Sequence, residues 1–567
     1  MKRIVVDIET DSLDATKIHC IVARNMETND NYAFVGSDCY DKFPAFINKH
    51  ADKIIMHNGI GFDAPVLNRL AGTKITIGQI EDTLIMSQLY NPERENGHSL
   101  DSWGKRFGFN KLEFNNFSEF SEEMLTYCRR DVELTHKVYN HLKLEGKRFS
   151  NYSLRLEHDI RSIVSKQEDN GFYIDQQKAS GLHAMLEDKA EQLEKEVHKT
   201  FPPLKIEEEF LPKVNNKSRG YVKGVPFTKV SYQEFNLASR KQIAERLMKL
   251  GWKPNKFTDK GSPIVDESVL SKIDNIAEAK LIAKYLLLKK RTSQISSWLD
   301  VVNQTTGRVH GRVLTLRCVS GRMSHHSPNM AQIPATYSPY GKECREVWTT
   351  DKPDTHVIFG TDASGLELRM LAHYINTSEY THEILNGDIH TKNMNMAGLS
   401  DRDQAKTFIY AFLFGAGAKK IAQIVGSKDM AVGKELIDKF LSELPRLKSF
   451  RSQVEEAAQS GKVKGLDGRL FNVRSPHKAV NTIIQGAGAI ACKVWLRNMI
   501  KHVRIKGLDV KLIASIHDEY QFEVNKNDIQ SMGEIVKLAI KETTEQLNLN
   551  CPLDAEFKTG SSWADTH

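Results

Sequence analysis

The chain begins with a regular alternation of short apolar runs and amphipathic segments. RIVVDIET and KIIMHNGIGFDAPVL each start with consecutive apolar residues and leave into a polar loop, whereas SEEMLTYCRRDVELTHKVYNHLKL has apolar residues three and four apart. Strands that alternate with helices are typical of an α/β unit, in which acidic residues at strand ends occupy the usual position of a site. We predict such a domain over residues 1–150.

The pattern is mainly helical over residues 151–300. Three segments have the helical repeat of apolar positions: LEHDIRSIVSKQEDNG, SGLHAMLEDKAEQLEKEVHKTF and EAKLIAKYLLLKKRTSQISSWL. Between the last two lies a Lys-rich stretch with several Pro and Gly residues, at about 201–235, which predicts an exposed loop or a small insertion.

From about residue 301 onward, short strands and helices alternate again. HVIFGTDASGLELRMLAHY predicts a strand that runs into a helix, and DRDQAKTFIYAFLFGAG predicts a helix closed by glycine. The strand-like run ASIHDEYQFEV holds two adjacent carboxylates, Asp518 and Glu519. Adjacent carboxylates repel each other and each is destabilised by loss of water, so this pair predicts a nearby cation.

Length and composition limit the class of protein. With 567 residues, the chain is long enough for three or four domains, and 40% hydrophobic and 27% charged residues are typical of a globular protein. It has no apolar run of membrane-spanning length, and its first residues enter a strand directly, so we expect a cytoplasmic protein with no membrane partner. Seven scattered cysteines without metal spacing predict reduced thiols, and a net charge of +7 is compatible with a polyanionic partner.

Four acidic residues of the first domain form a candidate metal site. Asp7 and Glu9 are two apart in VVDIET, a spacing that turns both side chains to one face of a strand. Asp63 follows HNGIGF. Asp131 lies four residues after Tyr127, so the side chains of Tyr127 and Asp131 share one side of a helix. If the acids converge, divalent cations are the expected compensation.

A second candidate site combines acids with cations. Asp362 ends an apolar strand and Asp518 lies between two others, so two aspartates on adjacent strands could hold a pair of Mg²⁺ ions for an in-line displacement. Arg402, Lys406 and Tyr410 are spaced by four and share one helical face, which predicts a phosphate-binding surface beside an aromatic ring.

These motifs resemble two known families. D-x-E, N-x-x-x-x-D and Y-x-x-x-D, in this order, resemble the DnaQ-like 3′–5′ exonucleases. DASGLELR, R-x-x-x-K-x-x-x-Y and HDE resemble motifs A, B and C of the DNA polymerase I family, family A. GDIHTKN, KTFIY, KGLDGR, VRSPH and SPYGKECR are similar to the replicative polymerases of the T-seven-type coliphages, and this likeness runs to the C-terminal residue, His567.

The resemblance implies roles for individual residues. In the exonuclease, two metal ions would be held by Asp7, Glu9, Asp63 and Asp131, and Tyr127 would orient the attacking water. In the polymerase, Asp362 and Asp518 would hold two Mg²⁺ ions, for which Mn²⁺ can substitute, with the Ala363 carbonyl assisting and Glu519 supporting them. The triphosphate contacts would be His390, Arg402 and Lys406, with Tyr410 near the sugar and Glu367 as the steric gate against a 2′-hydroxyl. The minor-groove contacts would be Arg322, Gln485 and His517.

The implied fold is α/β and α+β multidomain: a DnaQ-like (RNase H-like) exonuclease followed by a right-hand polymerase. Its expected parts are the exonuclease (1–150), thumb and connecting helices (151–300), first part of the palm (301–375), fingers (376–481) and second part of the palm (482–567). The implied function is primer-dependent, template-directed DNA synthesis with proofreading, in replication of a phage genome within the host bacterial cytoplasm. The implied partners are primer–template DNA and dNTPs, with a helicase–primase and a single-stranded DNA-binding protein as further candidates.

Two departures and two alternatives stay open. Phe414 stands where the family usually has tyrosine, and the 201–235 segment is much shorter than the thioredoxin-binding insertion of the coliphage enzyme, so thioredoxin is not expected as a partner. The Lys-rich segment could contact duplex phosphates or be an idle surface loop. The alternative functions are a single-subunit RNA polymerase and a processing exonuclease whose polymerase half only binds DNA.

Overall fold

The computed structural model describes residues 2–566, so the terminal residues of the predicted ranges, Met1 and His567, lie outside it. The chain forms two compact units. The first consists of Met1–Phe172, His310–Gln332 and Thr349–His567, and the second of Tyr173–Val309 and Ile333–Trp348.

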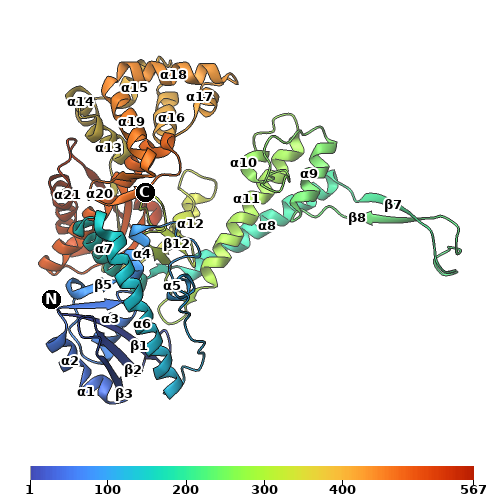
Figure 1. Cartoon of the computed structure of the whole chain (residues 1–567). Helices are drawn as coiled ribbons and strands as arrows, with labels where there is room; N and C mark the ends of the chain where they lie inside the picture. Colours follow the sequence, from blue (N-terminus) through green and yellow to red (C-terminus); the bar gives the residue numbers. More distant parts are fainter. Residues whose placement is uncertain (1, 567) are drawn as a thin grey trace. The chain divides into compact units, whose positions relative to one another are not determined.

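The N-terminal part of the first unit contains a five-stranded sheet with the order β3-β2-β1-β4-β5. β1 pairs antiparallel with β2 and parallel with β4. It is buried along most of its length because α6 packs on β1 and β2 (Figure 1), and the sequence accordingly predicted it as an apolar run. The elements are β1 Arg3–Thr10, β2 Ile18–Asn25, β3 Asn31–Val35, α1 Asp38–Asp41, α2 Phe43–His50, β4 Lys53–Met56, α3 Asp63–Leu70, β5 Ile80–Asp82, α4 Thr83–Tyr90, α5 Leu100–Phe107 and α6 Glu122–Glu145.

A second sheet of this unit has the order β17-β18-β14-β19, with every neighbouring pair antiparallel. The long helices α7 and α20 pack together, and α7 also packs on β17. The elements are α7 Asn151–Asn170, β11 Arg312–Leu314, β12 Ser324–His326, β14 His356–Ala363, α13 Leu366–Ile375, α20 Ala479–Lys506, β17 Val510–Ile516, β18 Glu519–Asn525, α21 Ile529–Gln546 and β19 Ala555–Gly560.

A helical region lies between the strands of this second sheet in the sequence. It comprises α14 Ser378–Asn386, α15 Ile389–Ala397, α16 Arg402–Leu413, α17 Ala418–Ile424, α18 Met430–Glu443 and α19 Pro445–Ala457, followed by the strand pair β15 Lys462–Lys464 and β16 Leu470–Asn472. Asp388 and Asp401 begin α15 and α16, where each carboxylate accepts hydrogen bonds from backbone N–H groups of the first turn.

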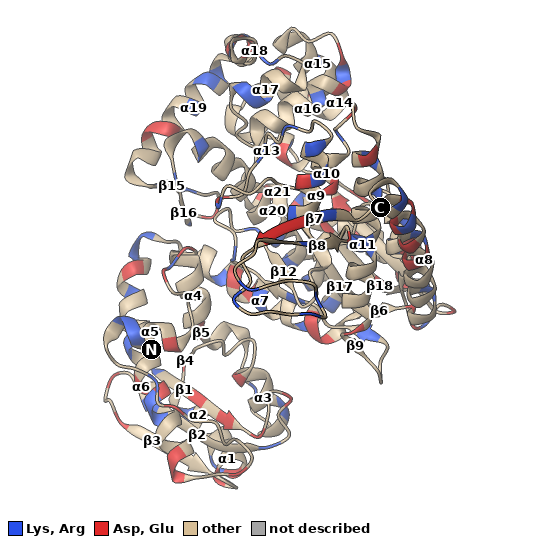
Figure 2. Ribbon diagram, turned by 90° about the vertical axis from the view of Figure 1, so that its right-hand side faces the viewer, with Lys and Arg blue, Asp and Glu red and all other residues tan. Residues whose placement is uncertain are grey.

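The second unit is built on the long helices α8 and α11, which pack side by side (Figure 1). The segment expected as an exposed loop or a small insertion is exposed and forms an antiparallel hairpin of β7 and β8. Its charged residues, including Glu207–Glu209 on β7 (red in Figure 2), hid the strand pattern from the sequence analysis. The elements are α8 Gln176–Thr200, β7 Leu204–Phe210, β8 Phe227–Gln233, α9 Arg240–Lys249, α10 Glu267–Leu270, α11 Ala277–Leu299 and α12 Gly341–Glu346, with the small sheet β6 Phe172–Ile174, β9 Val302–Asn303, β10 Arg308–Val309 and β13 Trp348–Thr349.

Among the described residues, one helical segment, Pro476–Lys506, is long and apolar enough to cross a membrane. In this structure 78% of its most apolar window is buried by the rest of the protein, which is the behaviour of a core helix. Its small residues permit close packing, since a Cβ at Gly486 would lie 2.4 Å from the Phe471 ring.

Candidate active sites

The four acids expected at the first site are brought together by three elements. Asp7 and Glu9 lie on β1, Asp63 is the first residue of α3, and Asp131 lies on α6, one turn after the half-buried Tyr127. Carboxylate oxygens of Asp7 and Glu9 lie within 4.8 Å of each other and of the Cys128 Sγ atom. The acids therefore form one cluster, which the sequence spacing predicted.

The cluster carries more negative charge than its surroundings compensate. Burial, and then repulsion from Asp63, Glu9 and Asp131, raises the pKa of Asp7 well above its usual range. Burial, followed by Asp131, raises the pKa of Glu9 to about 8, and burial raises the pKa of Asp63 to about 7. In the described part of the chain, Asp131 Oδ1 is buried without a hydrogen-bond partner. A cluster of carboxylate oxygens with too little positive charge around it fits divalent cations such as Mg²⁺.

The loop before Asp63 is held by an acid that the sequence analysis missed. The Asp82 carboxylate accepts hydrogen bonds from the backbone N–H groups of Asn58 at 3.0 Å and Ile60 at 3.1 Å. Within this loop a Cβ at Gly59 would lie 2.3 Å from the Met56 Cβ, so only glycine fits. Asp82 thus fixes the loop that leads into α3 and its first residue.

Lys111 was also missed. Its Nζ atom lies 2.5 Å from Asp131 Oδ2 and 4.8 Å from the centroid of the Tyr127 ring. Lys111 lies in the irregular segment between α5 and α6. Its contact with the cluster is therefore set by tertiary packing, and no periodic spacing could have indicated it.

A cavity of about 520 Å³ adjoins this cluster. Polar and basic side chains from separate segments line it, including His57, Asn58, Gln88, His98, Lys111 and Arg317. Its volume lies in the range of small-ligand sites.

The acids of the second site meet where β14 pairs with β18. Asp362 lies opposite Glu519, and the Ala363 N–H donates to the Asp518 carbonyl at 3.2 Å. Asp518 was expected within or between strands. It lies with His517 in the two-residue turn between Ile516 and Glu519, and His517 has the positive φ of 57° that such a turn requires.

The three acids of this site have different surroundings. Asp362 keeps an exposed surface, yet the surrounding protein and then Asp518 and Glu519 raise its pKa to about 7. Burial, followed by repulsion from Glu367, also raises the pKa of Asp518. Glu519 is buried, and its Oε1 atom accepts hydrogen bonds from Trp563 Nε1 and Gln521 Nε2, both at 2.6 Å. Asp362 and Asp518 are thus the acids of this site that most lack compensation.

Of the residues expected near the primer and the sugar, some lie together beside Asp518, and Gln485 does not lie with them. Arg322 donates to Glu367 at 2.8 Å, so these two side chains form an ion pair. Arg322, His517 and Asp518 line one small cavity of about 20 Å³. Gln485 is half-buried on α20 but does not line that cavity.

The helical face expected to bind the triphosphate lies on α16, next to α15. Arg402 donates to the Asp388 carboxylate at 2.7 and 3.0 Å. Burial, and then the charges of Arg402 and Lys406, lowers the pKa of His390, so these cations are close to it. The Tyr410 ring lies 6.2 Å from the His390 ring and 6.4 Å from the Phe414 ring. The acids Glu367, Asp518 and Asp362 raise the pKa of Tyr410 after burial, which connects this face with the second acidic site.

Comparison with known proteins identifies the family. Residues 215–565 match DNA polymerase family A, and residues 1–147 match its 3′–5′ exonuclease. The chain belongs to DNA polymerase family A. The DNA-directed DNA polymerases of Enterobacteria phage T3 and Escherichia phage T7 are 32% and 33% identical to this family A chain, over the whole of each sequence.

The fold is shared more widely. The POL domain of Pol1 from M. smegmatis, solved in complex with DNA primer-template and dNTP, superposes with a TM-score of 0.80 at 17% identity, covering 99% of this chain and 95% of that one. The expected fold class is confirmed, as is the expected activity: this is a DNA-directed DNA polymerase with a 3′–5′ exonuclease. Membership of both families implies use of divalent metal ions.

Proposed function

We propose that the two carboxylate clusters are two separate active sites of one replicative enzyme. The cluster of Asp7, Glu9, Asp63 and Asp131 removes nucleotides from a primer 3′ end, and Asp362 with Asp518 supports their addition. The observation that carries this proposal is that two uncompensated acidic clusters occur on two different sheets.

At the synthetic site, two bound Mg²⁺ ions would neutralise developing charge on the attacking and leaving oxygens of the displacement. Asp362 and Asp518, with the Ala363 carbonyl, are the groups that would hold them. Glu519, anchored by Trp563 and Gln521, keeps the strand end in place.

The face of α16 and α15 would bind the incoming dNTP. Arg402, Lys406 and His390 supply donors for phosphate oxygens, and Tyr410 supplies a ring against the sugar. Arg402 is paired with Asp388 in this structure, so we infer that it exchanges this carboxylate for phosphate when a dNTP binds. Arg322 would likewise exchange Glu367 for the primer–template minor groove, where Gln485 and His517 also contact the duplex. Glu367 then closes the space that a 2′-hydroxyl would need.

At the exonuclease site, Tyr127 would orient the attacking water, and two metal ions would be held by the four acids. The adjoining cavity, with His57, Asn58 and Arg317 on its walls, would receive the terminal nucleotide. Polar groups and cations are suitable partners for the bases and phosphates of an unpaired strand.

The two relatives that match this chain over its whole length, from phages T3 and T7, are phage polymerases. We therefore propose that this chain replicates a phage genome within the host cytoplasm, alongside a helicase–primase and a single-stranded DNA-binding protein.

A single assay tests the core of this proposal. A primed template with a mismatched 3′ end is incubated with Mg²⁺, first alone and then with dNTPs. We expect shortening without dNTPs, and removal of the mismatch followed by full extension with them. Shortening alone in both reactions would contradict the proposal that Asp362 and Asp518 support synthesis. Equal extension by rNTPs would contradict the role of Glu367 against a 2′-hydroxyl.

A further inference from the structure

The irregular segment between α5 and α6 delivers one lysine to the exonuclease cluster and is anchored to α6 by three of its aromatic rings. The Phe109 N–H donates to the Gly104 carbonyl at 2.9 Å, and the Phe109 ring lies 4.0 Å from the Arg130 guanidinium carbon on α6. The rings of Phe114 and Phe117 lie 5.5 and 6.2 Å from that of Tyr127. Lys111 is therefore held in place on both sides along the chain.

The lysine contacts two functional side chains at once. Its Nζ atom lies 2.5 Å from Asp131 Oδ2 and 4.8 Å from the centroid of the Tyr127 ring. Its side chain is 23% exposed and that of Asp131 is 5% exposed, so solvent screens this ion pair only weakly. Lys111 also lines the 520 Å³ cavity.

The division of the Asp131 oxygens is informative. Lys111 engages Oδ2, whereas Oδ1 is buried without a hydrogen-bond partner within residues 2–566. A lysine that merely filled an empty metal site would compete for the oxygen that a metal needs. Here Lys111 holds Asp131 Oδ2, and Oδ1 stays available to a metal ion.

The balance of charge at the exonuclease cluster also favours a role for Lys111 with metal ions bound. Four carboxylates carry four negative charges, and two divalent ions would cancel them completely. Lys111 adds one positive charge, which matches the single negative charge of a phosphodiester entering the site.

We propose that Lys111 is a positioning residue of the exonuclease: it clamps Asp131 so that Oδ1 faces the metal ions and fixes Tyr127 beside them. This inference rests on the proposed exonuclease function of the cluster. It assigns Lys111 no contact with the reacting atoms.

The test uses the full-length chain with Asp518→Asn as background, so that synthesis does not interfere, and adds Lys111→Met or Lys111→Arg. A matched control is Lys105→Met, because Lys105 makes an exposed ion pair with Asp101 on α5, away from the site. Removal of a group that orients a metal ligand typically costs 10- to 100-fold in metal affinity or activity. We expect Lys111→Met to lower kcat on single-stranded DNA by about 10- to 100-fold, Lys111→Arg to recover part of it, and Lys105→Met to have no effect.

Two readouts separate positioning from general damage. Mn²⁺ binding without DNA, followed by electron paramagnetic resonance, should weaken in Lys111→Met and not in Lys105→Met. In a double-mutant cycle with Tyr127→Phe, the combined loss should be smaller than the product of the single losses, because both changes disturb one unit. Lys111→Met in the otherwise unchanged chain should still extend primers, which verifies its folding.

Unchanged kcat and Mn²⁺ affinity in Lys111→Met would overturn the proposal. Tighter Mn²⁺ binding in Lys111→Met would also overturn it, since Lys111 would then be a competitor of the metal. A failure of the proposed exonuclease function would give a different result. In that case, adding Asp7→Ala and Glu9→Ala to the Asp518→Asn background would remove no nuclease activity.

Discussion

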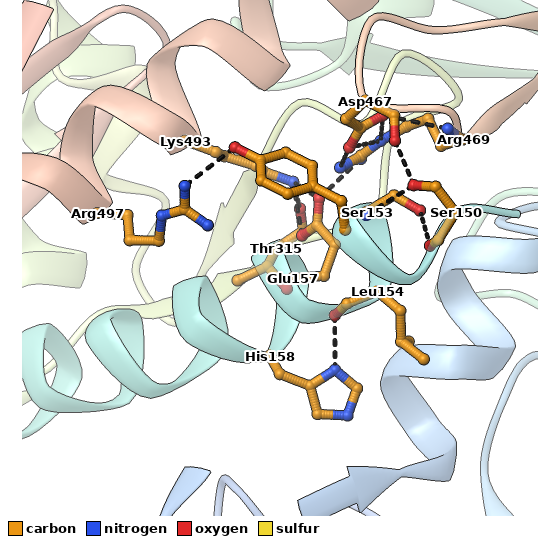
Figure 3. Close-up of polar contacts among 11 residues, drawn as sticks. Ser150, Ser153, Leu154, Glu157, His158, Thr315, Asp467, Arg469, Lys493 and Arg497 are labelled. Atoms are coloured by element: carbon orange, nitrogen blue, oxygen red, sulfur yellow. Dashed lines mark hydrogen bonds and ion pairs between the residues drawn. The ribbon is translucent and has the colours of Figure 1, made fainter. Parts of the chain in front are cut away.

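The exonuclease cluster and the polar cluster around Glu157 bury carboxylates in opposite ways. In the second cluster, Lys493 Nζ lies 2.8 Å from Glu157 Oε1, and Arg469 bridges Glu157 and Asp467 at 2.7 and 2.6 Å (Figure 3). Lys493 also donates to the Thr315 carbonyl. Two acids meet two cations there, whereas the four acids of the exonuclease cluster meet one lysine.

This difference separates structural charge from functional charge. A buried ion pair is tolerable when its geometry is good and the remaining donors are satisfied. The Glu157 cluster meets that condition and joins α7 to α20 and to the loop between β15 and β16. The exonuclease cluster does not meet it, and the raised pKa values of Asp7, Glu9 and Asp63 show the deficit. We infer that uncompensated buried acids mark the places that require added cations.

The synthetic site shows the same deficit in a more open setting. Arg322, whose charge acts on Asp518, is paired with Glu367, and Asp362 and Asp518 repel each other. The three clusters can therefore be distinguished by mutation.

The largest effect is expected at the synthetic site. Asp518→Asn removes one of two carboxylates that would hold the metal ions, and loss of several kcal/mol of charge stabilisation corresponds to about 10³-fold in rate. Primer extension should fall by this factor, while shortening of single-stranded DNA stays within about twofold. Loss of both activities in a folded protein would show that the clusters do not act separately.

The converse change, Asp7→Ala with Glu9→Ala, should lower 3′-end removal by a similar factor, about 10³-fold. Extension of a matched primer should remain, and a mismatched primer should stall. Because the change also removes mutual repulsion, the metal-free double variant should unfold at a higher temperature than the wild type. Persistent trimming at the wild-type rate would exclude these acids from catalysis.

Not every charged residue of these sites could be predicted from the sequence. Asp7, Glu9, Asp63 and Asp131 were predicted because local spacing on a strand and on helices, together with the family motifs, is sufficient to indicate them. Lys111 and Asp82 were missed because one lies in an irregular loop and the other acts on backbone N–H groups of a distant segment. Glu157 lies more than 300 residues before Arg469 and Lys493 in the chain, so only folding brings the cluster together. The position of Asp518 between two strands was predicted, because apolar residues continue on both sides of it.

Mutation of the Glu157 cluster should lower the free energy of unfolding and leave the two enzymatic activities unchanged. Glu157→Gln leaves Lys493 and Arg469 with too few negative partners, and breaking a buried pair in this way costs about 3–5 kcal/mol. Thermal or urea unfolding should show this loss, while both activities persist well below the unfolding temperature. Glu93→Gln is the matched control, because Glu93 pairs with Arg474 at the surface and its loss should cost less than about 1 kcal/mol.

A second variant sharpens that result. Adding Lys493→Met to Glu157→Gln leaves the pair of Arg469 and Asp467 balanced, so part of the lost stability should return. A further loss equal to that of the first change would mean that Lys493 contributes through packing and not through charge balance.

The smallest effect concerns pH. The folded-state pKa of Glu9 is raised from 4.5 to about 8, so the folded protein binds this proton more tightly than the unfolded chain does. Its contribution to stability is therefore complete below the unfolded pKa and is lost as pH rises toward 8. Between pH 6.5 and 8 the loss from one such group is about 1–2 kcal/mol. Asp63, with its pKa raised to about 7, acts in the same direction over the lower part of this range.

Buried histidines such as His57 and His98, whose pKa values burial lowers to about 4, stay neutral in the folded protein but are partly protonated in the unfolded chain near pH 6.5. They therefore oppose this slope, and comparison of the wild type with Glu9→Gln cancels their contribution. Without divalent metal, the unfolding free energy of the wild type should fall, relative to that of Glu9→Gln, by about 1–2 kcal/mol between pH 6.5 and 8. The control Glu123→Gln should show the same fall, since Glu123 is exposed on α6 and its pKa is lowered, so it is ionised in both states. Saturating Mg²⁺ should reduce the slope in the wild type by stabilising the ionised form. A slope that Glu9→Gln leaves unchanged would mean that the cluster is already compensated within the folded chain, and the contrast with the Glu157 cluster would then be lost.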